Sequence, residues 1–233
     1  MADPVRRSPD RRLSVRPLSA RRNTISPIDH LHAPLVGLDI ETDTSVDGLD
    51  PRRSAIVALA LSTPTADLVF DHPDETELLT AADAAIADLG DGVLVTWNGA
   101  GFDLPFIAHR ADHLGVGLGL TVEFDPSIPG RHDPLPGQPG RVRGRWHGFG
   151  HLDGYQAYRS DVGQTLPVSC GLKSLARFVG LPVVEVDRAR IHELTVEQRR
   201  TYVASDARLA RALVDRRADR AASVDHLPSS RGS

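Results

Sequence analysis

The octapeptide LVGLDIET, residues 35–42, combines the apolar pattern of a β-strand with two acidic residues near its end. Side chains alternate between the two faces of a strand, which places Asp39 and Glu41 together on one face. Two carboxylates at this spacing repel each other in a partly buried setting unless a cation lies between them. Oxygen ligands of this kind suit Mg²⁺ or Mn²⁺. The alternative is a strand that ends at Ile40, with Glu41 opening a solvated loop.

The segments that follow this strand predict a mixed sheet covered by helices. Further strands are indicated by AIVALALST, ADLVFDH and GVLVTW, and more weakly by GFGHLD at residues 148–153. Apolar positions at helical spacing predict helices over residues 74–89, 101–114 and 170–180 and from Thr195 to about Arg217, where Thr195 and Gln198 form a capping box. Glycine and proline are frequent over residues 121–148, which predicts a long inserted loop. This order of elements favours an α/β fold with a mixed central sheet flanked by helices.

Length and composition favour a single folded domain. The chain has 233 residues, of which 40% are hydrophobic and 25% charged. Residues 1–33 are rich in arginine, serine and proline and predict a disordered basic arm, and residues 218–233 predict a disordered tail around a domain spanning 34–217. The single cysteine, Cys170, excludes an intrachain disulfide and a multi-thiolate zinc site, which favours a reducing, cytoplasmic location. No apolar run is long enough to span a membrane.

Two further motifs contain acidic residues next to predicted apolar segments. In VTWNGAGFDLPFIAHR, residues 95–110, a buried strand ends at Asn98 and Asp103 begins a helix. In TYVASDARLARAL, residues 201–213, Tyr202 and Asp206 share one apolar helical stripe, where an unpaired aspartate is costly. Taken singly, Asp103 could be only a helix-start residue, Asn98 only a turn residue, and Asp206 a solvated neighbour of arginines.

Together these motifs identify a family. DIE in a first strand, Asn-x-x-x-Phe-Asp-x-Pro at a helix start and Tyr-x-x-x-Asp in a C-terminal helix occur in the order of the three exonuclease motifs of the DEDD (DnaQ-like) superfamily. The sequence resembles that superfamily from about Pro34 to Arg217, and Tyr202 places it in the DEDDy branch. NGAGFDLPFI and LKSLARFVG look most like the proofreading exonuclease domain of family B DNA polymerases.

This resemblance implies a ribonuclease H-like fold and a metal-dependent 3′-5′ exonuclease that uses two divalent ions, Mg²⁺ or Mn²⁺. It implies that Asp39 bridges both ions, that Glu41 and Asp206 complete the site of the ion that delivers the attacking water, and that Asp103 supports the second ion. Tyr202 would orient the water. A metal pair about 3.5 to 4 Å apart suits in-line displacement at a phosphodiester. Cys170 has no evident catalytic role.

Several other residues are candidates for holding the substrate. Asn98 and Phe102 belong to the middle motif. In the segment predicted as a loop, phosphates and a base would be contacted by Arg141, Arg143, Arg145 and Trp146; a solvated loop without such a role is the alternative. Asp153 matches an aspartate that such exonucleases often carry, and we interpret it as a structural cap. The net charge of −4 gives no global basic field, so binding of a polyanion would depend on local arginines and metal ions.

Competing functions stay open at this point. Single-stranded DNA is favoured as substrate, but ribonuclease D-like enzymes use the same chemistry on RNA, and the motifs do not distinguish the two. A catalytically silent ribonuclease H-like module that binds nucleic acid or protein would have no reason to retain Asp39, Glu41, Asp103, Tyr202 and Asp206 together. A phosphatase with an aspartate nucleophile fits poorly, because Glu41 stands where such enzymes usually place a second aspartate. A proofreading role would require a separate polymerase or repair partner.

Overall fold

The computed structural model describes residues 34–130 and 135–217. Its strands are β1 (Leu35–Thr42), β2 (Ile56–Ser62), β3 (Asp67–Phe70), β4 (Asp91–Thr96), β5 (Leu120–Phe124), β6 (Val142–Trp146) and β7 (Gly148–Asp153). Its helices are α1 (Glu75–Leu89), α2 (Asp103–Leu114), α3 (Gly154–Ser160), α4 (Val162–Thr165), α5 (Leu172–Phe178), the 3₁₀ segment η2 (Arg188–Glu193) and α6 (Val196–Asp215). The predicted arm and tail, residues 1–33 and 218–233, lie outside the described residues.

The seven strands form one mixed sheet in the order β3-β2-β1-β4-β7-β6-β5. The three central strands β1, β4 and β7 run parallel, and the outer strands are antiparallel to their neighbours. Parallel strands need long connections, and here helices α1 and α2 provide them. The predicted mixed sheet flanked by helices is therefore confirmed.

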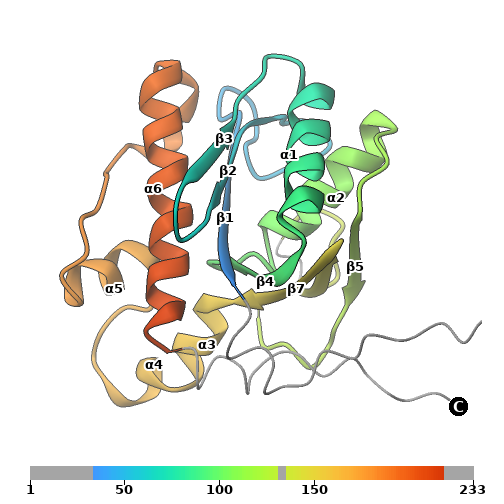
Figure 1. Ribbon diagram of the computed structural model, residues 1–233. Coiled ribbons are helices and arrows are strands. Elements are labelled where there is room, and N and C mark those ends of the chain that lie inside the picture. The colour runs from blue at the N-terminus through green and yellow to red at the C-terminus, as the bar shows by residue number, and fades with distance from the viewer. Residues whose placement is uncertain (1–33, 131–134, 218–233) are drawn as a thin grey trace, which may run out of the picture.

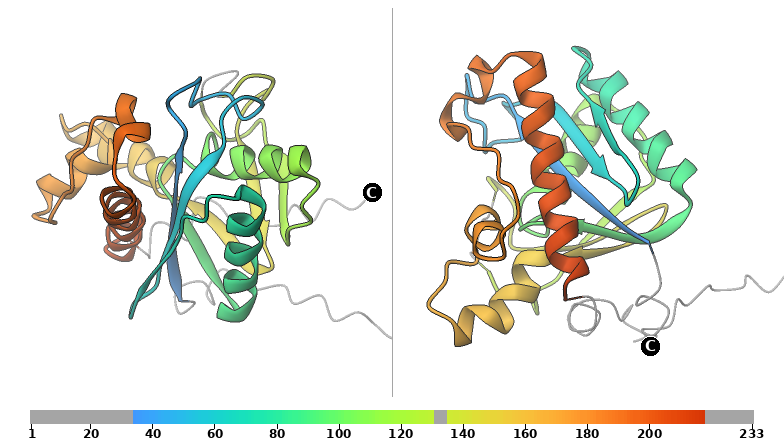
Figure 2. Two further views of the ribbon diagram at one scale, coloured as in Figure 1. Left: turned by 90° about the horizontal axis from the view of Figure 1, so that it is seen from above. Right: turned by 60° about the vertical axis from the view of Figure 1, so that its left-hand side comes forward.

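Helices cover both faces of this sheet (Figure 1). Helices α1 and α2 pack on one face, where apolar side chains of β1 such as Leu38 and Ile40 join the largest core cluster. Helix α6 crosses the opposite face, as both views in Figure 2 show, and packs with α3 and α5 in a second cluster. The alternation of β1 thus sends its apolar residues to α1 and α2, and its acidic residues to α6.

One sequence prediction for the fold is wrong. Residues 121–148 are not a single long loop, because they contain most of an antiparallel pair, β5 and β6, that extends one edge of the sheet. At Gly144 in β6, a Cβ would lie 2.3 Å from Leu104 Cδ1 of α2, so a larger residue there would displace the Leu104 side chain. Glycine in this strand marks a close approach to α2.

The predicted helices are present with small changes of boundary. Helix α2 begins at Asp103 rather than Gly101, and α6 has the predicted capping box of Thr195 and Gln198. Helices α3 and α4 and the segment η2 were not predicted. Within the described residues, every helix is too short or too polar to cross a bilayer.

Candidate active site

The carboxylates of β1 face helix α6, which approaches the strand very closely. An ideal Cβ on Gly37 would lie only 2.0 Å from the carbonyl oxygen of Ala207, so only glycine permits this contact. On the neighbouring strand β2, Ala58 and Ala60 pair with Glu41 and Asp39 and are fully buried against small residues of α6. Small side chains at the contact bring the helix, and with it Asp206, next to β1.

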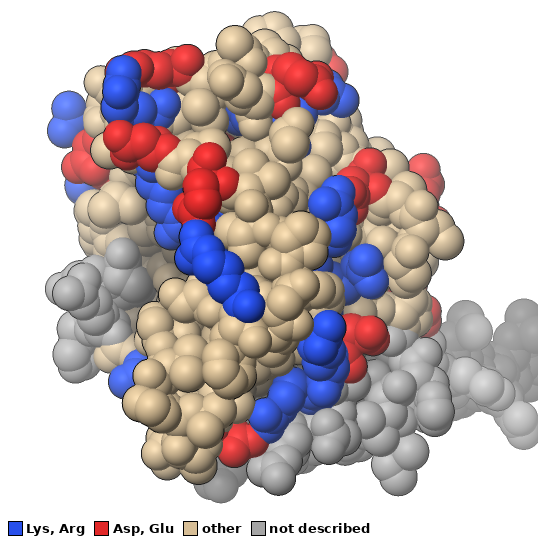
Figure 3. Space-filling view, turned by 90° about the vertical axis from the view of Figure 1, so that its left-hand side faces the viewer, with Lys and Arg blue, Asp and Glu red and all other residues tan. Residues whose placement is uncertain are grey.

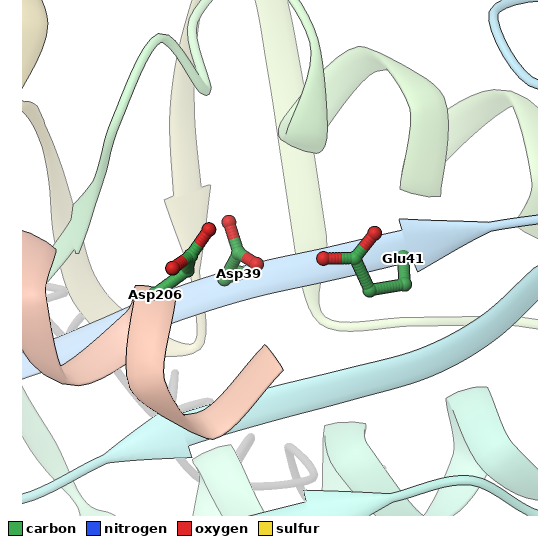
Figure 4. Close-up of side chains that lie close together, drawn as sticks. All are labelled: Asp39, Glu41 and Asp206. Atoms are coloured by element: carbon green, nitrogen blue, oxygen red, sulfur yellow. The ribbon is translucent and has the colours of Figure 1, made fainter. Parts of the chain in front are cut away.

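Asp39, Glu41 and Asp206 form a three-carboxylate cluster. One carboxylate oxygen from each lies within 4.8 Å of the others. Figure 4 shows Asp39 and Glu41 projecting from β1 toward Asp206, which comes from α6. Asp206 is buried, with 2% of the residue exposed, and Tyr202 lies one turn earlier in the same helix with 1% exposed. The structure thus brings together residues of the first and third motifs.

Asp103, at the start of α2, lies beside this cluster rather than in it. Pairing of β1 with β4 runs only from Leu35 to Gly37, so the later backbone of β1 has no strand on that side. The Asp103 carboxylate accepts a hydrogen bond there from the backbone of Ile40, and another from its own N–H. Its charge also raises the pKa of Asp39 and Glu41. Asp103 therefore interacts electrostatically with both acidic residues of β1.

The cluster is electrostatically unfavourable by itself. Burial raises the pKa of Asp39 well above its usual value, and the charges of Asp206, Glu41 and Asp103 raise it further. Burial and the charge of Asp206 raise the pKa of Glu41 to about 8. Burial raises the pKa of Asp103 to about 7, although its backbone hydrogen bonds oppose this shift. Like charges in a partly dry site need a positive partner.

Two cations that sequence reasoning missed lie at this cluster. Lys173 Nζ of α5 lies 3.5 Å from Asp206 Oδ2 and 3.9 Å from the centre of the Tyr202 ring, and it donates a hydrogen bond to the carbonyl of Val184 at 2.8 Å. Arg188 of η2 places Nη2 3.8 Å from Asp206 Oδ2 and donates from Nε to the Tyr202 hydroxyl at 3.2 Å. The one available signal was that Lys173 is the only lysine in the chain.

The site fits a divalent cation. Among the described side chains, Asp39 Oδ2 and Asp206 Oδ1 are buried and accept no hydrogen bond. Buried carboxylate oxygens are ordinarily satisfied, and three carboxylates at this spacing supply the hard oxygen ligands that Mg²⁺ and Mn²⁺ prefer. Asp39, Glu41 and Asp206 therefore suit one such ion, and Asp103 is placed to assist from the side of α2.

Arg141, predicted as a phosphate contact, is instead part of the scaffold. Its side chain is 8% exposed, and its Nη1 donates to Asn98 Oδ1 at 2.8 Å and lies 3.7 Å from Asp153 Oδ2. Asn98 has a left-handed backbone with φ of 74°, as expected for a turn residue. Asp153 caps α3 and accepts from the backbone of Asn98 and Ala100, which confirms its interpretation as a cap.

Trp146 is also buried, with 1% exposed, and donates from Nε1 to Asp83 at 2.6 Å, so the prediction that it stacks on a base is wrong. Phe102 is half-buried and packs on Phe106, with ring centres 5.3 Å apart. Arg145 is exposed, and Arg143 pairs with Asp125.

Beside α3, a pocket of about 510 Å³ is lined by Ser127, Ile128, Pro129, Arg143, Gln156, Arg159, Ser160, Gly163 and Gln164.

The arginines of α6 do not form a separate basic surface. On the side of the molecule that carries α6, basic and acidic side chains alternate (Figure 3). Arg200 pairs with Asp71 at 2.9 Å, and Arg208 pairs with Asp67. Two of the four arginines of α6 are therefore paired with acidic side chains of this chain.

Comparison with known proteins agrees with this arrangement. No curated protein matches the chain. The structure of the family B DNA polymerase from the hyperthermophilic archaeon Pyrobaculum calidifontis matches with a TM-score of 0.60 over 79% of this chain, at 21% identity. At that identity the likeness shows the fold alone, which is the ribonuclease H-like fold of a polymerase exonuclease domain. The chain spans only 24% of the length of that polymerase.

Residues 52–173 match the family described as the exonuclease domain of DNA polymerase family B. The matched segment contains the middle motif, with Asn98, Phe102 and Asp103, and also Lys173. It ends before Tyr202 and Asp206 and begins after β1. Because the match covers more than half of the chain, the protein belongs to the family of the exonuclease domain of family B DNA polymerases.

Proposed function

We propose that this protein is a divalent-metal-dependent 3′-5′ exonuclease that degrades nucleic acid, with single-stranded DNA as its preferred substrate. The observation that supports it most directly is the convergence of Asp39, Glu41 and Asp206, two of which have buried oxygens without a hydrogen-bond donor. Membership of the exonuclease family supports the same activity. A structural carboxylate cluster would be expected to pair all of its oxygens.

In this proposal Asp39, Glu41 and Asp206 hold one Mg²⁺ or Mn²⁺, and Asp39 and Asp103 hold a second. Bound ions of this kind lower the pKa of water and stabilise the charge on an attacked phosphodiester. The side chains around them position the reactants. The Tyr202 hydroxyl lowers the pKa of Asp206, and from this place it would orient the attacking water. Lys173 fixes the Tyr202 ring from one face.

Membership of the exonuclease family supports the proposed preference for DNA and for a free 3′ end. An RNA-directed exoribonuclease is the second candidate, since a contact to the 2′-hydroxyl is what distinguishes the two substrates. We further propose that the enzyme works with a polymerase or repair partner, because family B polymerases carry this domain beside a polymerase. A catalytically silent binding module would bind the same strands without cutting them.

The test uses the purified full chain with DNA and RNA strands of one sequence, labelled at either end, with Mg²⁺, Mn²⁺ or a chelator. We expect stepwise shortening from the 3′ end that stops on chelation, faster on single-stranded DNA than on RNA. Circular single-stranded DNA should persist. Cutting of the circle, or shortening from the 5′ end, would overturn the 3′-5′ assignment, and faster loss of RNA would favour the second candidate. Binding without any cleavage would favour the silent module.

A further inference from the structure

The two cations at the carboxylate cluster are held in very different ways. The side chain of Lys173 is 11% exposed and is fixed by the Val184 carbonyl at 2.8 Å and by the face of the Tyr202 ring. The side chain of Arg188 is 70% exposed, and its closest approach to a carboxylate of the cluster is 3.8 Å. That distance is long for a charge-assisted hydrogen bond, which is ordinarily about 2.7 to 2.9 Å. Arg188 therefore neutralises the cluster from its mouth without being bound tightly there.

The segment that carries Arg188 is anchored, whereas the side chain has one hydrogen bond, from Nε to the Tyr202 hydroxyl at 3.2 Å, and the 3.8 Å ion pair with Asp206. His192 of η2 contacts Thr44 in the loop after β1. The Thr44 hydroxyl lies 2.8 Å from His192 Nδ1 and accepts a hydrogen bond from the His192 backbone N–H, which ties η2 to that loop. The Asp187 side chain caps the segment through the Ala189 N–H. The backbone thus keeps Arg188 beside the cluster, and the long side chain can turn away from it into solvent.

The charge balance of the cluster indicates when the Arg188 side chain would move away from the carboxylates. Arg188 lowers the pKa of Asp39, Glu41 and Asp206, so its charge acts on the whole cluster. Two divalent ions would balance the four carboxylates by themselves. Lys173 and Arg188 would then be surplus positive charge, and the less firmly held of the two is Arg188. A planar guanidinium that leaves the carboxylates at the mouth of the site matches the geometry of a phosphate.

We propose that Arg188 is an internal counter-cation that a divalent ion displaces from the carboxylate cluster, and that the displaced guanidinium then binds a phosphate of the substrate strand. Arg188 thereby opposes metal binding in the free enzyme and favours it when a strand is present. Because such coupling is reciprocal, the metal also strengthens strand binding. This inference rests on the proposed function, since it assumes a metal site and a nucleic-acid substrate.

The test measures Mn²⁺ binding by calorimetry, so it does not depend on turnover. In the absence of nucleic acid, Arg188→Gln should bind Mn²⁺ on the order of tenfold more tightly than the unaltered chain. Arg190→Gln is the matched control, because Arg190 lies in the same segment, is exposed and pairs with Glu193. It should leave the affinity unchanged. Circular dichroism checks that each variant is folded.

A second titration adds a saturating short DNA strand whose terminal linkage is a phosphorothioate, which resists cleavage and retains its charge. The strand should tighten Mn²⁺ binding by the unaltered chain and by Arg190→Gln, and at least about threefold less by Arg188→Gln. Arg188→Lys keeps the positive charge but loses the paired N–H donors of the guanidinium. It should therefore weaken Mn²⁺ binding as arginine does, and bind the strand more weakly than arginine.

The failures are distinguishable. This inference would be overturned if Arg188→Gln bound Mn²⁺ as tightly as the unaltered chain, or more weakly. Metal-dependent digestion by the unaltered chain would in that case still support the proposed function. An equal effect of the strand on Arg188→Gln and the unaltered chain would remove the phosphate contact. Absence of Mn²⁺ binding by the unaltered chain would overturn both.

Discussion

The Lys173 ammonium lies 3.9 Å from the centre of the Tyr202 ring and 3.5 Å from Asp206, so one cation contacts both residues of the third motif. A cation over an aromatic face is attracted by the ring quadrupole and restricts the ring to one position. The ring carries the hydroxyl that lowers the pKa of Asp206. Lys173 thus connects α5 to Tyr202 and Asp206, the two residues of α6 that are proposed to act in catalysis.

Lys173→Gln should fold and lose activity. Without the ammonium, Tyr202 and Asp206 lose the contact that fixes them, and misplacement by about 1 Å can cost on the order of 10²-fold in rate. We expect kcat to fall much more than KM changes, in single-turnover digestion of a labelled strand. Arg177→Gln is the control, because Arg177 lies on the same helix but pairs with Glu185 at the surface. Equal loss in both variants would point to a general defect of α5.

Asp39→Asn should abolish metal-dependent digestion without unfolding the protein. The charges of the other three acidic residues all raise the pKa of Asp39, so removing its charge relieves repulsion in the metal-free fold. The melting temperature of the chelated protein at pH 8 should rise by about 2 to 4 °C. Asp91→Asn, at an exposed position, should change neither property. A folded Asp39→Asn enzyme with full turnover would contradict the assignment of the site.

The stability of the metal-free protein should fall as the pH rises. The pKa of Glu41 increases from 4.5 to about 8 on folding, and that of Asp103 increases from 3.8 to about 7. A raised pKa means that the folded state holds protons that the unfolded state has lost, so this contribution is present at low pH and is lost up to about pH 8. The melting temperature in chelator should therefore be lower at pH 8 than at pH 6. Added Mn²⁺ should raise it more at pH 8, where protons no longer compete; a larger effect at pH 6 would contradict this account.

The sequence predicted those features of the site that depend on local periodicity. Alternation along β1 separates Asp39 and Glu41 from Ile40, and the helical stripe places Tyr202 with Asp206; both patterns are properties of one element. Contacts that depend on the packing of distant elements were out of reach. Nothing in the segments around Lys173 and Arg188 indicates that both side chains lie beside Asp206 of α6.

The failure at residues 121–148 has a different cause. Strand β5 is at the edge of the sheet and only partly buried, and β6 contains Gly144 and two arginines. Neither strand therefore shows the apolar alternation on which strand prediction depends. Arg141 and Trp146 were assigned to the substrate for the same reason, since a residue placed in a loop is expected to be exposed.

Gly37→Ala should destabilise the protein and weaken its metal site. A Cβ at this position would lie 2.0 Å from the backbone of Ala207, which cannot move without displacing α6. We expect a loss of about 2 to 3 kcal/mol in urea unfolding. We also expect weaker Mn²⁺ binding, because Asp206 follows the helix. Gly117→Ala is a suitable control, since a Cβ at Gly117 meets no described atom within 4 Å. Unchanged stability of Gly37→Ala would show that α6 is free to shift.

The arginines of residues 141–145 should separate into scaffold and substrate contacts. Arg141→Ala leaves Asp153 and Asn98 without their buried partner and should lower stability by about 3 kcal/mol, since one member of a buried pair then remains uncompensated.

Arg143 and Arg145 are more exposed, and Arg143 also lines the pocket beside α3. The double variant Arg143→Ala with Arg145→Ala should fold normally and bind single-stranded DNA less tightly. Each lost phosphate contact should lower the slope of log affinity against log salt by about 0.7. Turnover at saturating strand should change much less, because contacts distant from the scissile bond act similarly on ground and transition states. Fluorescence anisotropy over a range of salt concentrations measures the slope, and an unchanged slope in the double variant would assign the grip on the strand to other parts of the chain.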